Sequence, residues 1–261
     1  MTPDVFRGLY CEAHGNGFPL VLISGGGVLD RRGWDQQFET FARDHRVVRY
    51  EVRGIGKSVR PSESFSHSDD LYELLAALRI ERAHLVALSV GAAVAIDFCL
   101  EHPEMVGRLI LAAAGTSDDA KSAENLQGLS MLAAITKNEG LERTIQMTLD
   151  SPFVLSKANT AAREAVRRIY LDNHDVFESG FPVFSLWRPT EPPAGKRLSS
   201  IQAQVLVVRG DNDSPAYSTM TTRIAADIPG AREVVIAGGT HFLNLEKAAE
   251  FDTAVLEFLK T

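Results

Sequence analysis

A serine at position 89 stands between an apolar segment and a segment of small residues, in the stretch "HLVALSVGAAVAIDFC" (84–99). The first half is typical of a buried strand, and the second half of a helix. Ser89 is then either the N-cap of that helix or a nucleophile held on a tight strand-to-helix turn, as in the motif G-x-S-x-G. Here Ala87 replaces the first glycine and Gly91 is the second. Both are small, so the strand and helix backbones can approach closely around Ser89.

A serine hydroxyl is a weak nucleophile, so the second interpretation requires a histidine base and a carboxylate that orients it. His241 follows a strand-like run and two glycines, in "VVIAGGTHFLNLE". Asp213 follows the preceding strand-like run, in "VLVVRGDNDSPAY", and Asp211 and Asp118 are the alternatives. The chain order Ser, Asp, His is the order that this turn motif requires. We therefore predict a catalytic triad of Ser89, Asp213 and His241.

Two glycine-rich loops follow strand-like runs, and neither fits a phosphate-binding motif. The loop "GIGKSVRP" runs into Pro61 instead of a helix, and neither loop has the third glycine of a dinucleotide fingerprint. The three consecutive glycines Gly25–Gly27 can instead bring backbone N–H groups against a ligand atom. We predict that the N–H groups of Gly26 and Val90 form an oxyanion hole. A flexible loop is the alternative.

The elements that must position these residues follow from the apolar pattern. Six short apolar runs predict strands: 19–24, 46–52, 83–89, 108–114, 203–210 and 232–238. Several of them are apolar on consecutive positions, which is typical of strands covered on both faces of a parallel sheet. Helical spacing separates several of them, as in "SDDLYELLAALRI" with Ser66 or Ser68 as its cap. Alternating strands and helices predict a doubly wound, mostly parallel α/β sheet.

One long segment breaks the alternation. Residues 116–196 show no strand pattern, are helical in period, and end in the Pro-rich "RPTEPPAGK". We predict a helical cap inserted between late strands, with residues 1–115 and 197–261 as the core domain. Such an insertion lies over the edge where parallel sheets bind ligands. Phe181, Phe184 and Trp187 within it are predicted to line an apolar substrate pocket; the alternative is that they only attach the cap to the core.

Composition limits the class of protein. The 261 residues carry a formal net charge of -7, which argues against nucleic acid as the partner. No run of residues is long and apolar enough to span a membrane, and no secretory signal pattern opens the chain. Two cysteines, Cys11 and Cys99, give no disulfide framework, so a reducing cytoplasm is expected. No metal-ligand spacing is present, so we expect neither metal nor organic cofactor; a homodimer is left open.

Further stretches resemble the α/β-hydrolase fold family, in its small capped form that includes esterases, enol-lactonases and C–C hydrolases. "EVRGIGKS" is similar to the family's D-x-R-G-x-G-x-S, with Glu51 for Asp, and "LEHPEMVGRLIL" is similar to its helix-to-strand passage. Ser24 stands where the family carries the His of an HG dipeptide. The resemblance covers nearly the whole chain outside the cap. It implies the same triad and the same oxyanion donors, Gly26 and Val90.

The predicted reaction is hydrolysis of a small carboxylic ester or lactone through an acyl-enzyme on Ser89. Two alternatives remain. The same triad could serve C–C bond cleavage, thioester hydrolysis or cofactor-free oxygenation, or the chain could be a non-catalytic ligand-binding protein on this scaffold. Arg31 and Arg32, beside the glycine loop, either attract an acidic substrate or are solvated; we favour the second.

Overall fold

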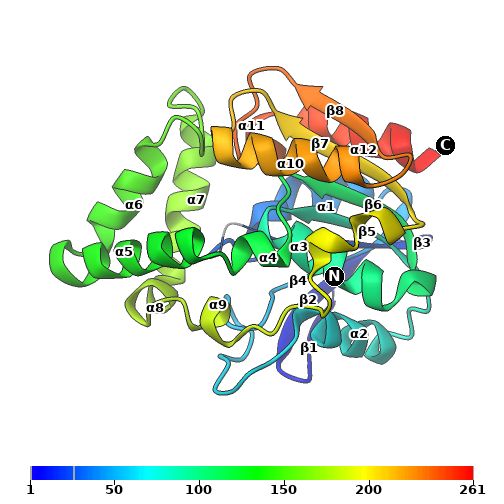
Figure 1. Ribbon diagram of the computed structural model, residues 1–261, viewed down its shortest axis with the longest axis horizontal. Helices are drawn as coiled ribbons and strands as arrows, with labels where there is room; N and C mark the ends of the chain where they lie inside the picture. Colours follow the sequence, from blue (N-terminus) through cyan, green and yellow to red (C-terminus); the bar gives the residue numbers. More distant parts are fainter. Residues whose placement is uncertain (1, 26, 261) are drawn as a thin grey trace.

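A single sheet dominates the computed structural model, which describes residues 2–25 and 27–260 (Figure 1). Its strand order is β1-β2-β4-β3-β5-β6-β7-β8. The strands from β4 to β8 in this order pair in parallel, and β1 and β2 pair antiparallel at one edge. The described strands are β1 (Thr2–Phe6), β2 (Leu9–His14), β3 (Phe18–Ile23), β4 (His45–Tyr50), β5 (Ala83–Leu88), β6 (Val106–Ala112), β7 (Gln204–Gly210) and β8 (Arg232–Ile236). This is the doubly wound, mostly parallel sheet that the sequence predicts.

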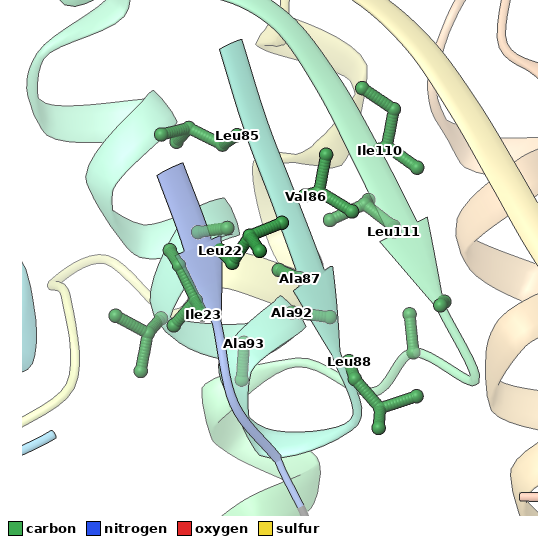
Figure 2. Close-up of a cluster of buried hydrophobic side chains, with 14 of the residues drawn as sticks. Leu22, Ile23, Leu85, Val86, Ala87, Leu88, Ala92, Ala93, Ile110 and Leu111 are labelled. Carbon is green, nitrogen blue, oxygen red and sulfur yellow. The ribbon is translucent and has the colours of Figure 1, made fainter. Parts of the chain in front are cut away.

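Consecutive apolar residues place the central strands in the core. The last four residues of β3 and of β5 are buried on both faces of the sheet. Figure 2 shows Leu22 and Ile23 of β3, Val86 and Ala87 of β5, and Ile110 and Leu111 of β6 in one cluster, with Ala92 and Ala93 of the following helix beside them. The small helical side chains let that helix lie close to the sheet.

The sequence analysis missed the hairpin of β1 and β2. Arg7 and Gly8 connect these strands, and both have positive φ, 49° and 84°. Two residues with positive φ are what a tight two-residue hairpin turn demands, which explains the glycine there. The hairpin extends the sheet beyond β4 on the side away from Ser89.

Helices flank the sheet in two groups. The first group contains α1 (Asp35–Phe41) and α12 (Ala248–Lys260), which contact each other. The second contains α2 (His67–Ala77) and α3 (Val90–Glu101), which contact each other, and α3 also contacts β3, β5 and β6. Ser66 caps α2 by accepting from the Asp69 N–H, so of the two predicted caps, Ser66 and Ser68, the structure shows Ser66. The remaining helices of this part are η1 (Arg31–Trp34), η2 (Pro103–Met105), α10 (Pro215–Asp227) and α11 (Leu243–Glu246).

Residues 116–196, which we call the helical segment, lie between β6 and β7. Figure 1 shows α5, α6, α7 and α8 gathered to one side of the sheet. Its helices are α4 (Ser117–Ala120), α5 (Ala123–Glu139), α6 (Leu141–Asp150), α7 (Thr160–Asp172), α8 (His174–Glu178), α9 (Pro182–Leu186) and η3 (Ala194–Lys196), and η4 (Leu198–Ser200) follows. The segment, all of it described, contains no strand, only an isolated bridge between Phe65 and Trp187. Its separation as a domain remains a prediction.

A buried carboxylate joins the helical segment to α3. Asp97 of α3 accepts from the Ser117 hydroxyl at 2.7 Å and from the Thr190 N–H at 3.3 Å. Ser117 lies where the chain enters the helical segment, and Thr190 lies near where it leaves. Burial raises the pKa of Asp97 to about 7 despite these two donors.

Both cysteines are buried and unpaired. Desolvation raises the pKa of the Cys11 thiol to about 11 and that of Cys99 to about 12, so both stay protonated at neutral pH. No helix among residues 2–25 and 27–260 is long and apolar enough to cross a lipid bilayer.

Candidate active site

Ser89 occupies a strained turn between β5 and α3. Its backbone has φ 54° and ψ -117°, a conformation that non-glycine residues rarely adopt. Its side chain makes no capping hydrogen bond to α3, so it is not the simple N-cap that was the alternative interpretation. Its N–H donates to the Ala112 carbonyl at 2.8 Å, which ties the turn to the end of β6. Strain of this kind is characteristic of functional turns.

Two glycines that pack tightly around the Ser89 turn, Gly25 and Gly91, allow this turn to form. A Cβ on Gly91 would lie 2.4 Å from the Ile23 carbonyl oxygen, and one on Gly25 would lie 1.9 Å from the Leu88 carbonyl oxygen. A side chain at position 91 would therefore collide with the backbone of the neighbouring strand β3, not with that of β5. Ala87 is fully buried in β5, and its methyl group fits.

The three predicted triad side chains meet. The Ser89 Oγ lies 2.9 Å from the His241 Nε2, and the His241 Nδ1 lies 3.0 Å from the Asp213 Oδ2. All three residues are buried. The other Asp213 oxygen, Oδ1, accepts from the Ser214 N–H at 2.6 Å, which fixes the carboxylate plane. With both its oxygens placed, Asp213 can orient the imidazole toward Ser89.

The alternative carboxylates point elsewhere. Asp211 accepts from the Gly238 N–H at 2.6 Å and so joins the loop after β7 to the loop after β8. Asp118 accepts from the Gly195 N–H at 2.8 Å within the helical segment. Neither bonds to His241, so Asp213 alone of the three occupies the orienting position.

The helical segment supports the loop that carries His241. The His241 N–H donates to the Phe153 carbonyl at 2.8 Å, and the Phe242 N–H and Thr240 hydroxyl donate to the Val154 carbonyl. Thr240 also bonds to Glu246 of α11. The position of the imidazole therefore depends on the chain between α6 and α7 as well as on β8.

Tyr217 completes the surroundings of the triad, and the sequence analysis did not single it out. Its ring lies 4.1 Å from the His241 ring, centroid to centroid. Burial raises the pKa of the Tyr217 phenol, and a hydrogen-bond interaction with the Ser89 side chain opposes that rise. Ser214 caps α10 and so places Tyr217 in the first turn of that helix, above the triad. The phenol is a neutral neighbour of the Ser89 hydroxyl.

One of the two predicted oxyanion donors is placed by the structure. Val90 is the first residue of α3, where N–H groups have no partner within the helix and the helix dipole is positive. Gly26 lies outside the described residues. Its neighbour Gly25 packs against the Ser89 turn, as its close approach to the Leu88 carbonyl and the Ser89 Cβ shows.

Two hollows lie beside this site. The larger is a cleft of about 860 Å³ that includes Ser89, Tyr217 of α10 and Leu129 of α5 among its lining residues. The smaller is a cavity of about 20 Å³ lined by Gly25, Gly27 and residues of α9. Val90 lines both. We call them the large cleft and the small pocket.

The predicted aromatic pocket residues separate into two groups. Phe184 and Trp187 line the small pocket. Phe181 lines neither hollow; it is buried and packs on the Phe177 ring with centroids 5.3 Å apart, inside the helical segment. The small pocket also contains His67, whose Nε2 is buried without a hydrogen-bond partner among the described residues. Burial lowers the pKa of His67 to about 3, so it is neutral at physiological pH.

The expectation that Arg31 and Arg32 are solvated is wrong. Arg31 donates to both Glu12 and Glu51 at 2.7 Å, and its side chain is only 16% exposed. Arg32 pairs with Asp30 and with Asp172 of α7, both at 2.6 Å. These guanidinium groups are paired structural cations, so they do not attract an acidic substrate either.

No group of three or more His, Cys, Asp or Glu side chains among the described residues is arranged to hold a metal ion.

Comparison with known proteins places this chain in a family. The sequence profile of the alpha/beta hydrolase family matches residues 20–254, and the chain belongs to that family. It is 27% identical to a putative carbamate hydrolase RutD from Rhizobium rhizogenes, over 97% of this chain and 98% of that one. It is 31% identical to a 2-hydroxy-6-oxononadienedioate/2-hydroxy-6-oxononatrienedioate hydrolase from Burkholderia vietnamiensis, over 92% and 86% of the two chains. Both relatives are named as hydrolases.

Solved structures share the fold. An enol-lactonase from Burkholderia xenovorans LB400 matches with a TM-score of 0.81 and 22% identity over the whole of both chains. A hydrolase from Pseudomonas aeruginosa matches with a TM-score of 0.79 and 26% identity, over 100% of this chain and 98% of that one.

Proposed function

We propose that this protein is a serine hydrolase that cleaves a small carboxylic ester or lactone through an acyl-enzyme on Ser89. The observation that carries the proposal is the hydrogen-bonded chain from Ser89 through His241 to Asp213, with 2.9 Å and 3.0 Å between the donor and acceptor atoms. The position of Ser89 on a strained turn at the carboxyl end of β5 supports a nucleophilic role for its hydroxyl.

Each residue has a definite role in the proposed reaction. His241 Nε2 takes the Ser89 proton as Oγ attacks the carbonyl carbon, and the developing oxyanion accepts from backbone N–H groups at the start of α3 and in the glycine loop. Asp213 keeps the proton on Nδ1, so that Nε2 is free to act as the base. The tetrahedral intermediate then expels the alcohol oxygen, which takes the proton from the His241 imidazolium, and the acyl-enzyme remains. Water attacks the acyl-enzyme with His241 again as base, and the acid and free Ser89 result.

The charge of the lining favours an ester over the dicarboxylate named for one relative. Among the described residues that line the large cleft, none is Lys, Arg or His, and Asp119 and Glu124 are acidic. The small pocket contains one basic group, His67, which stays neutral. A dienedioate carries two carboxylates, and neither hollow offers a cation to bind them.

Labelling with a fluorophosphonate probe tests the proposal. We expect Ser89 to be the labelled residue and p-nitrophenyl acetate to be hydrolysed. The Ser89→Ala variant should lose both the label and at least about 10³-fold of the activity, as removal of a triad member does. Hydrolysis that persists in Ser89→Ala, or the absence of any label, would refute the proposal; a carbamate, a thioester and a C–C substrate in the same panel test the other bond types.

A further inference from the structure

The two hollows beside Ser89 differ greatly in volume, about 860 Å³ for the large cleft and about 20 Å³ for the small pocket. On this measure a single water-sized group needs about 10–15 Å³. The small pocket therefore accepts about one methyl-sized group, whereas the large cleft accepts a bulky one. Val90, the residue after Ser89, lines both, so both hollows adjoin the turn that carries Ser89.

Proton transfer decides which half of an ester enters which hollow. The imidazole must give the proton taken from the serine to the departing alkoxide oxygen, so the alcohol half lies on the His241 side of Ser89. Tyr217 packs against the His241 ring and lines the large cleft. The described lining of the small pocket includes neither residue and lies along the glycine loop instead.

We propose that the small pocket binds the acyl half and the large cleft binds the alcohol half, so that the substrate is an ester of a short, acetyl-sized acid with a bulky, uncharged, largely apolar alcohol. This inference rests on the proposed function. The bond from Ser89 Oγ to the acyl carbon forms as the bond to the alcohol oxygen breaks, and the Ser89 proton passes through His241 to that oxygen. Water then releases the short acid. A lactone joins both halves in one ring, so the arrangement favours an open-chain ester.

The walls of the small pocket are well suited to exclude longer acyl chains. Val183, Phe184 and Trp187 are buried side chains, and the Phe184 ring would meet a Cβ on Gly27 at 3.2 Å. Packed interiors resist added methylenes, because neighbouring side chains and backbone must then shift.

The large cleft has a looser, apolar wall. Leu129 and Leu132 of α5 are half-buried and Met131 is 57% exposed, so a bulky apolar group gains contact there. Its acidic groups disfavour a carboxylate on the alcohol, although Asp119 is paired with Arg223 and only Glu124 is exposed.

Hydrolysis of 2-naphthyl acetate, butanoate and hexanoate by the full chain measures the acyl preference with one leaving group. We expect kcat/KM to fall at least about 10-fold from acetate to hexanoate. Comparing phenyl acetate with 2-naphthyl acetate tests the large cleft, because phenol and 2-naphthol are similar leaving groups that differ in size. We expect kcat/KM to be higher for the naphthyl ester. A naphthyl acetate that carries a carboxylate on its naphthyl ring should have a lower kcat/KM than 2-naphthyl acetate.

Two variants test the assignment directly. Phe184→Ala should raise the hexanoate-to-acetate ratio of kcat/KM about 10-fold, and Val183→Ala should raise it too if the first variant does not fold. The matched control, Met131→Ala in the large cleft, should leave this ratio unchanged while weakening the preference for naphthyl over phenyl.

The outcomes separate this inference from the proposed function. If Ser89 is labelled and hexanoate is preferred over acetate, or if Met131→Ala rather than Phe184→Ala changes the acyl ranking, the assignment of the hollows is wrong and the serine hydrolase stands. If no ester is hydrolysed and Ser89 is not labelled, both fail.

Discussion

Replacing Asp213 by asparagine tests the orienting role of the carboxylate with almost no change of shape. The Asp213 Oδ1 accepts from the Ser214 N–H at 2.6 Å, and Oδ2 accepts from His241 at 3.0 Å. An asparagine has one oxygen, and the Ser214 N–H requires it. The amide NH₂ then faces Nδ1 of His241, so the imidazole proton moves to Nε2, which can no longer accept the Ser89 proton.

The expected loss of rate in Asp213→Asn follows from the energy that the alternative orientation of the amide would cost. A flipped amide would restore the active tautomer of His241, but its NH₂ group would then face the Ser214 N–H. Two buried donors without acceptors cost about 2–6 kcal/mol. That range corresponds to about 30-fold to 10⁴-fold in rate. We expect a loss of about 10³-fold or more, because the negative charge that stabilises the imidazolium is lost as well.

The assay is kcat/KM for an aryl acetate, with thermal unfolding measured on the same samples. The matched control is Asp211→Asn, two residues away, where the side chain keeps an oxygen for the Gly238 N–H. That exposed change should alter kcat/KM less than about threefold. A loss below about 10-fold in Asp213→Asn, or an equal loss in both variants at unchanged stability, would contradict the orienting role.

Two further predictions concern the fold around the site. Gly91→Ala should lower the free energy of unfolding by about 3 kcal/mol in a urea titration, since its Cβ would lie 2.4 Å from the Ile23 carbonyl oxygen. Ala87→Gly should cost only about 1 kcal/mol and keep the activity; equal stability of the two variants would refute the steric argument. The raised pKa of Asp97, about 7, means that the native state binds this proton more tightly than the unfolded chain does, so its contribution to stability is present below about pH 4 and is lost as the pH rises through 7. Relative to Asp97→Asn, the wild type should therefore lose up to about 1.4 kcal/mol per pH unit between pH 4 and 7 in the same titration, and parallel pH profiles would contradict this.

The sequence predicts the parallel part of the sheet better than the antiparallel hairpin. The central parallel strands β3, β5, β6 and β7 are recognisable because apolar residues stand on consecutive positions, as burial on both faces requires. The last strand, β8, is mostly exposed and was recognised from a shorter apolar run. The hairpin of β1 and β2 lacks that pattern, because the buried run of β2 includes the charged Glu12, which pairs with Arg31 and Arg49. The signal that could have found the hairpin is Gly8, at a turn of positive φ. The long helical pattern of residues 122–149 is broken at Gly140, which separates α5 from α6.

The convergence of Ser89, Asp213 and His241 was predictable because these residues are marked by chain order and by strand ends, which are local properties. The sequence already favours Asp213 over Asp211, and the coordinates show that Asp213 is the carboxylate that faces His241. Tyr217 and His67 were missed because their importance arises only from what packs beside them. The partners of Arg31 are equally non-local, since Glu12 and Glu51 come from β2 and the end of β4.

The two buried thiols offer a way to observe the molecule opening. Cys99 lies on α3, which begins directly after Ser89, and Cys11 lies on β2, so a reagent such as a maleimide reaches each only when its element separates from the sheet. The native protein should therefore resist alkylation. In mild denaturant, the rate at which each thiol reacts measures the detachment of α3 and of the edge hairpin, read by mass spectrometry without any engineered label.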